Sequence, residues 1–141
     1  MTDAKCEIEG LEECFAEVRG ARLRYLAGGE GDPLVLVHGL GGAAANWLAL
    51  APLLLPRWRL LVPELPGHGG SEPLSAAPSL NAYADRIGLL MEDEGFTPAA
   101  VVGHSLGGAI SLRLAIRRPD AVSALVLTGS AGISSSLRRA R

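Results

Sequence analysis

Four apolar runs constrain the fold of this chain more than any other feature of its sequence. They are LVLV at 34–37, the first half of RLLVPELPGHG at 59–69, AAVV at 99–102 and ALVLTG at 124–129. A strand without apolar–polar alternation is buried on both faces, which is typical of a parallel sheet. Helical patterns lie between the runs, at 47–55, 80–94 and 106–118. This alternation of strands and helices predicts an α/β fold with right-handed crossovers.

The segment before these runs predicts an antiparallel hairpin. Residues 15–26 alternate, with one face formed by Ala21, Leu23 and Tyr25 and the other by Arg22 and Arg24. The pattern is typical of a half-exposed hairpin that turns at Arg19-Gly20. With the four buried runs, the prediction is a mostly parallel sheet of about six strands, flanked by helices.

Composition indicates one globular domain and excludes several classes of partner. The 141 residues are 48% apolar and 20% charged, with a formal net charge of -2. We divide them into an acidic lead-in (1–14), a core domain (15–132) and a tail (133–141). Because no basic face stands out, we expect neither a nucleic-acid partner nor an anionic membrane partner.

The sequence gives no sign of a signal peptide, a membrane-spanning segment or a metal site. The first 18 residues hold six acids and no apolar segment of the kind found in a signal peptide, so we expect a cytoplasmic protein. The longest apolar run, WLALAPLLLP, is too short to span a bilayer. No histidine or further cysteine stands near Cys6 and Cys14, so we expect free thiols and no metal site.

Three glycine-rich turns follow three of the buried runs. They are HGLGG at 38–42, GHGGS at 67–71 and GHSLGG at 103–108. In an open α/β sheet, ligands bind where the carboxyl ends of the strands meet. We therefore expect the three turns to converge on one binding edge.

The sharpest motif is Gly103-His104-Ser105-Leu106-Gly107. A serine at a tight strand-to-helix turn has strained backbone geometry, and its neighbours two residues away must be very small. The turn exposes the Ser105 hydroxyl at a helix N-terminus, where the Leu106 N–H can stabilise developing negative charge. Ser105 is thus a candidate nucleophile. The alternative is a glycine-rich helix start with a capping serine.

The turn His38-Gly39-Leu40-Gly41-Gly42 supplies a candidate for a second donor. Its glycines allow the backbone to turn sharply, so that the Leu40 N–H can point at a substrate carbonyl oxygen. Leu40 and Leu106 would then form an oxyanion hole. The alternative is an ordinary loop between a strand and a helix.

The motifs HGLGG, ELPGHGGS and GHSLGG, in this order, resemble those of the α/β-hydrolase superfamily over about residues 15–132. The resemblance implies a partial α/β-hydrolase fold and a serine hydrolase that acts on a carboxylic ester or related carbonyl compound, without a cofactor. It also implies supporting roles for Gly39, Gly103, His104 and Gly107, and for His38 as a brace of the oxyanion loop. Glu64 departs from the usual aspartate. A serine at position 105 is unlike haloalkane dehalogenases and epoxide hydrolases, which carry an aspartate there.

The remaining two members of a catalytic triad are not found in this sequence. The family order is serine, acid, histidine, but Asp120 is the only acid after Ser105 and no histidine follows it. Asp120 is expected at the opposite edge of the sheet, one helix of about 18 Å away. His38 and His68 are weak alternatives for the base. We therefore expect an N-terminal fragment, ending where the lid of the family begins, that is inactive or very weakly active alone.

A second hypothesis is a finished, non-catalytic protein that binds a ligand or a second chain. Its last predicted strand, ALVLT at 124–128, would form an open edge of the sheet. Such an edge can pair with another strand, so this hypothesis includes self-association. The high apolar content fits both hypotheses.

Overall fold

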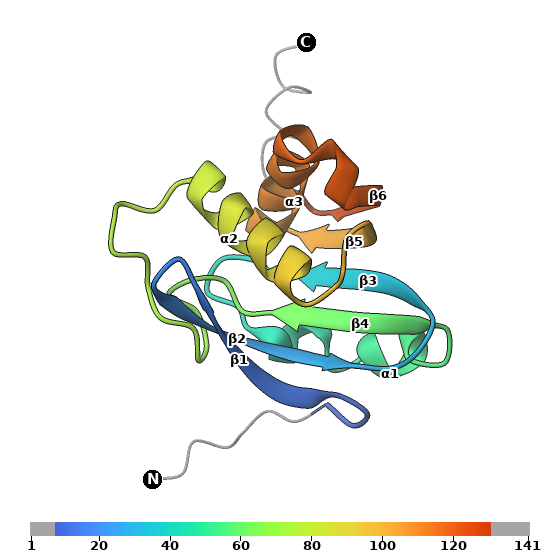
Figure 1. Cartoon of the computed structure of the whole chain (residues 1–141). Helices are drawn as coiled ribbons and strands as arrows, with labels where there is room; N and C mark the ends of the chain where they lie inside the picture. Colours follow the sequence, from blue (N-terminus) through green and yellow to red (C-terminus); the bar gives the residue numbers. More distant parts are fainter. Residues whose placement is uncertain (1–7, 131–141) are drawn as a thin grey trace, which may run out of the picture.

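The computed structural model describes residues 8–130, which form one six-stranded sheet with helices on both faces (Figure 1). The strands are β1 (Glu12–Val18), β2 (Ala21–Gly28), β3 (Asp32–Val37), β4 (Trp58–Pro63), β5 (Ala99–His104) and β6 (Val122–Thr128). The helices are α1 (Ala51–Leu54), α2 (Leu80–Asp93) and α3 (Leu106–Arg117), with 3₁₀ turns η1 (Ala44–Trp47) and η2 (Pro119–Ala121). The predicted tail and the beginning of the lead-in lie outside the described residues.

The sheet has the order β1-β2-β4-β3-β5-β6 and is parallel from β4 to β6. β1 pairs antiparallel with β2, and β2 pairs antiparallel with β4. This arrangement confirms the predicted fold class, a mostly parallel sheet with an N-terminal hairpin. No helix among the described residues has the length and apolar character needed to cross a bilayer.

Two apolar cores explain why the strand sequences are unbroken. On β3, Val35 and Val37 face the core under α2 and α3, whereas Leu34 and Leu36 face the core under η1 and α1. Figure 1 shows these helices on opposite sides of the sheet. Because successive side chains of a strand alternate between its faces, burial of both faces requires apolar residues at every position.

The hairpin begins at Glu12 rather than at residue 15, and one part of its predicted pattern is wrong. Arg19 and Gly20 both have positive φ (47° and 79°), as a two-residue hairpin turn requires. Arg22 is exposed as expected, but Arg24 is only 8% exposed. Its guanidinium is bound by Glu13 and Glu64, and these two carboxylates permit the burial of its charge.

The helix expected at 47–55 is only the single turn α1, and the 3₁₀ turn η1 ends at Trp47, where that helix was expected to begin. Pro52 lies at the start of α1, because proline has no backbone N–H and is accepted only in the first turn of a helix. α2 begins after Ser79, whose hydroxyl accepts a hydrogen bond from the Ala82 N–H, as in an ordinary N-cap. α2 and α3 agree with their predicted ranges to within one residue at each end.

The close packing of α3 against the end of β3 gives a stability prediction. A Cβ at Gly107 would collide with the carbonyl oxygens of Val37 and His38, which are backbone atoms that cannot move aside. Gly107→Ala is therefore expected to lower the free energy of unfolding by about 3 kcal/mol, measured by urea denaturation.

Gly88→Ala in α2 is the matched control. The new methyl group would meet flexible side-chain atoms of Arg118 and Leu114, at 2.7 and 3.0 Å, and alanine favours the helix. Gly88→Ala should lower the free energy of unfolding clearly less than Gly107→Ala does. Equal costs for the two variants would show that α3 can move away from β3.

Candidate active site

Ser105 forms the turn between β5 and α3 in a conformation that few residues other than glycine adopt. Its φ is 54° and its ψ is −121°. The Ser105 N–H donates to the Thr128 carbonyl (3.0 Å), and the Ser105 carbonyl accepts from the Gly108 N–H (2.9 Å). Such backbone strain costs on the order of 1–3 kcal/mol and persists only when neighbouring contacts hold it. It is the geometry that the glycine–serine spacing predicts.

Glycines on both sides of Ser105 are required by space. A Cβ at Gly103 would lie 2.5 Å from the Gly107 carbonyl oxygen and 2.6 Å from Ser111 Oγ. Gly107 is packed against the end of β3, as described above. The two predicted supporting positions therefore let α3 start directly above the sheet.

The turn at 38–42 lies beside the Ser105 side chain. A Cβ at Gly39 would lie 3.0 Å from Ser105 Cβ and 3.4 Å from Ser105 Oγ. Ser105 is partly exposed and its side chain does not cap α3. Leu106 is the first residue of α3, where a backbone N–H has no acceptor within the helix. Two segments far apart in the sequence thus meet at the hydroxyl.

The peptide that joins Gly39 to Leu40 is fixed in orientation. The Gly39 carbonyl accepts hydrogen bonds from the Gly42 N–H (3.0 Å) and from His38 Nδ1 (2.7 Å). Since a trans peptide is planar, its N–H points away from its carbonyl. The Leu40 N–H is therefore held pointing away from the buried imidazole, while the Leu40 side chain is exposed.

His38 is fully buried, and both of its ring nitrogens are engaged. Nε2 accepts from the Leu65 N–H (3.0 Å), which assigns the proton to Nδ1 and makes the ring neutral. Burial lowers the pKa of His38, and nearby His68 acts in the same direction. The hydrogen bond to Gly39 and the Glu64 carboxylate oppose the shift only in part. His38 braces the turn and has no free nitrogen to accept a proton.

All three histidines of the chain lie within the described residues, and none is hydrogen-bonded to the Ser105 hydroxyl. His68 Nδ1 lies 3.1 Å from the Pro66 carbonyl. His104 is exposed and contacts Thr128 at 3.0 Å, beside β6. Asp120 lies in η2, where β6 begins, rather than where β5 ends. Within residues 8–130, Ser105 therefore has no base–acid pair.

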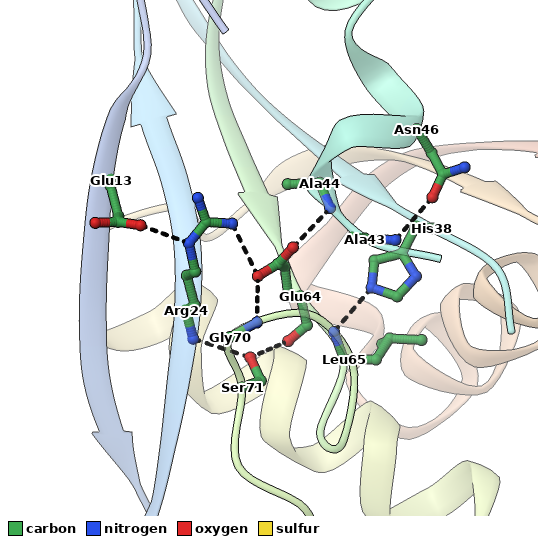
Figure 2. A network of polar contacts seen from close by, with 10 residues as sticks. All are labelled: Glu13, Arg24, His38, Ala43, Ala44, Asn46, Glu64, Leu65, Gly70 and Ser71. Carbon is green, nitrogen blue, oxygen red and sulfur yellow. Dashed lines mark hydrogen bonds and ion pairs between the residues drawn. The ribbon is translucent and has the colours of Figure 1, made fainter. Parts of the chain in front are cut away.

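Glu64 is the residue that the sequence analysis underestimated. The residue is buried, and its carboxylate accepts hydrogen bonds from Arg24 Nη1 (2.9 Å), the Gly70 N–H (2.9 Å) and the Ala44 N–H (3.0 Å) (Figure 2). Burial acts to raise the pKa of Glu64, but these three donors outweigh it and the pKa is lowered. Glu64 is therefore a buried carboxylate at the centre of a polar network, held in its charged form. The sequence signal that could have indicated this role is the position of a charged residue directly after a buried strand.

Ser71 closes this network on the side of the hairpin. Its hydroxyl donates to the Glu64 carbonyl (2.7 Å) and accepts from the Arg24 N–H (2.9 Å). The Glu64 N–H donates in turn to the Arg24 carbonyl (2.9 Å). No group of three or more potential metal ligands occurs among residues 8–130.

The lowered pKa of His38 predicts how stability depends on pH. Below the ordinary imidazole value of 6.5, the unfolded chain takes up a proton that the folded chain refuses, so stability falls as pH falls. The slope contributed by one group is at most about 1.4 kcal/mol per pH unit. Urea denaturation between about pH 7.5 and 5.5 measures it, above the ordinary value of 4.5 for the Glu64 carboxyl.

His38→Asn should remove this part of the slope, although it also lowers stability at neutral pH. His104→Gln, which changes an exposed imidazole, is the matched control and should keep the slope of the unmutated chain. An identical slope in His38→Asn would contradict the assignment.

Comparison with known proteins places this geometry in a family. A family model described as alpha/beta hydrolase fold matches residues 32–138. The dihydrolipoyllysine-residue acetyltransferase component of the acetoin cleaving system of Pseudomonas putida is 40% identical, over 86% of this chain and 34% of the relative. The 2-hydroxymuconate semialdehyde hydrolase of Pseudomonas sp. (strain CF600) is 39% identical, over 82% of this chain and 42% of the relative.

Solved structures agree with this result. A membrane phospholipase A matches with a TM-score of 0.83 and 31% identity, over 94% of this chain and 46% of that one. The epoxide hydrolase CorEH matches with a TM-score of 0.80 and 28% identity, over 83% and 41%. This chain spans about a third of the length of the first curated relatives. The chain belongs to the α/β-hydrolase family.

Proposed function

We propose that this chain is part of a serine hydrolase that acts on a carboxylic ester or related carbonyl compound, with Ser105 as the nucleophile. One observation carries the proposal: the Ser105 backbone is strained, and its hydroxyl does not cap α3 but lies beside the glycine turn at 38–42. An ordinary capping serine needs neither feature, as Ser79 at the start of α2 shows.

In the proposed reaction, Ser105 Oγ attacks the carbonyl carbon of the substrate and gives its proton to a base. The carbonyl oxygen becomes an oxyanion, which the N–H groups of Leu40 and Leu106 stabilise by about 3 kcal/mol each. Collapse of this intermediate breaks the bond to the leaving group, which takes the proton from the base. Water then hydrolyses the acyl-serine by the same steps.

We further propose that the base and its supporting acid come from polypeptide outside this sequence. The described residues offer no such pair to Ser105, and the matching relatives are about two to two and a half times as long. Their names support chemistry of the proposed class: one is an acetyltransferase component, another a semialdehyde hydrolase and a third a phospholipase. Alone, the chain is expected to be inactive or very weakly active.

Acetylation by p-nitrophenyl acetate tests the nucleophile without needing a complete triad. The acetyl group should transfer slowly to Ser105, releasing p-nitrophenol, and this transfer should be at least about 10-fold faster than at Ser79, whose hydroxyl caps α2. Intact-mass measurement and peptide mapping locate the label, and Ser105→Ala should abolish it.

Ser79→Ala is the matched control, because it removes a serine at an ordinary helix start and should leave the labelling of Ser105 unchanged. Equal labelling of the two serines would contradict the proposal. Sustained turnover that is lost in both Ser105→Ala and His68→Ala would instead show that the base lies within this chain.

A second candidate, a non-catalytic protein that pairs with another chain, is favoured by the exposure of β6. Among the described residues only β5 pairs with β6, whose sequence VSALVLT contains neither a charge nor a proline. Val126 is 52% exposed on this strand. Natural edge strands are commonly protected by charged residues or prolines, which β6 lacks.

Light scattering at increasing concentration tests this candidate. The unmutated chain should self-associate, and Val126→Lys should make it monomeric, because a charge on the edge strand opposes pairing. Leu53→Lys, on the exposed surface of α1, is the control and should leave the association unchanged. Association that Val126→Lys abolishes, without any acetylation of Ser105, would favour this candidate over the hydrolase.

A further inference from the structure

A buried ion pair outside the proposed catalytic groups is joined to both ends of the turn that carries Leu40. The pair is Arg24 and Glu64, with side chains 10% and 2% exposed and a distance of 2.9 Å from Nη1 to Oε1. The role assigned to this pair rests on the proposed function of Ser105 and Leu40.

The first connection runs from Glu64 to the residue where the turn passes into η1. Glu64 Oε2 accepts the Ala44 N–H at 3.0 Å, whereas Oε1 accepts from Arg24 and the Gly70 N–H. Figure 2 shows the carboxylate between the guanidinium of Arg24 and the backbone of Ala44. The position of the carboxylate therefore determines where the turn ends.

The second connection runs through the next residue of the chain, Leu65. Its N–H donates to His38 Nε2 at 3.0 Å, and His38 Nδ1 holds the Gly39 carbonyl at 2.7 Å. The same peptide carries the Leu40 N–H. Residues 64 and 65 thus fix the turn from both of its ends.

Arg24 in turn fixes Glu64 to the hairpin. Its Nε donates to Glu13 on β1 at 2.7 Å, and its backbone binds the Glu64 N–H and the Ser71 hydroxyl. A buried carboxylate without its cation either takes up a proton or moves towards water, and both changes weaken its bond to a backbone N–H.

We propose that Arg24 and Glu64 are positioning residues for the oxyanion turn. The hairpin places Arg24, Arg24 orients the Glu64 carboxylate, and the carboxylate holds Ala44 so that the Leu40 N–H stays beside Ser105. The pair does not touch the substrate, and it acts on the rate through Ala44 and Leu40.

The test compares Arg24→Met with the unmutated chain by two readouts. The first is the amide ¹H–¹⁵N shifts of Ala44 and Leu40, which should move more than those of residues in α2. The second is the rate of Ser105 acetylation per folded molecule, which should fall about 10-fold, a fraction of the loss expected when a whole oxyanion donor is removed. Arg24→Lys, which keeps a cation beside Glu64, should recover most of that rate.

Glu72→Gln is the matched control, because this exposed residue lies on the same loop and its side chain accepts a hydrogen bond from the Arg22 N–H, not from Arg24 or Ala44. It should leave both readouts unchanged. If Arg24→Met does not fold, Arg24→Gln provides the same comparison, because it removes the charge and keeps an N–H donor.

The two proposals fail in different ways. Shifted amides in a chain whose Ser105 is never acetylated would refute the nucleophile and support the positioning role. Normal acetylation with unmoved amides of Ala44 and Leu40 in the Arg24 variants would overturn the positioning role. A loss of stability spread evenly over the chain, with an unchanged rate per folded molecule, would likewise reduce the pair to a structural ion pair.

Discussion

The contact between Gly107 and the end of β3 is the constraint on which the rest of the site depends. Because β3 and β5 are parallel neighbours, the chain leaves β5 immediately beside the carbonyls of Val37 and His38. α3 can start there only if its first turn has no side chain at Gly107. Ser105 must then turn the chain within one residue, and its positive φ is the result. The strain at Ser105 is thus set by the spacing of two strands.

Near the site, buried polar groups join the antiparallel and parallel parts of the sheet in addition to the backbone ladder and the apolar core. Where β2 meets β4, hydrogen bonds connect Arg24, Glu64 and Ser71 with one another. Glu64 extends this network to Ala44. In such a network only one arrangement gives every polar group its hydrogen-bond partner, whereas apolar side chains can repack in several arrangements. That property would suit the proposed role of the turn at 38–42, in which the Leu40 N–H must point in one direction.

Features with a local cause could be predicted from the sequence. Unbroken apolar runs predicted strands buried on both faces, and the glycines around Ser105 predicted a strained turn, because both depend on neighbouring residues. The burial of Arg24 could not be predicted, since the alternation of a strand carries no information about a carboxylate 40 residues away. The helix expected at 47–55, which Pro52 limits, is shorter than its pattern indicates, because α1 covers only Ala51–Leu54. Glu64 could be recognised only as part of the motif ELPGHGGS, because its three donors come from separate segments.

The strand order has a consequence for how the parts assemble. The bonds that shape the turn at 38–42 close loops of 20 and 27 residues, whereas the β3–β5 pairing that brings up Ser105 closes a much longer one. Shorter loops lose less chain entropy on closure, so local contacts tend to form earlier in folding. The contacts that shape the turn at 38–42 are therefore expected to form first, and the pairing of β5 with β3 then brings Ser105 beside a turn that is already ordered.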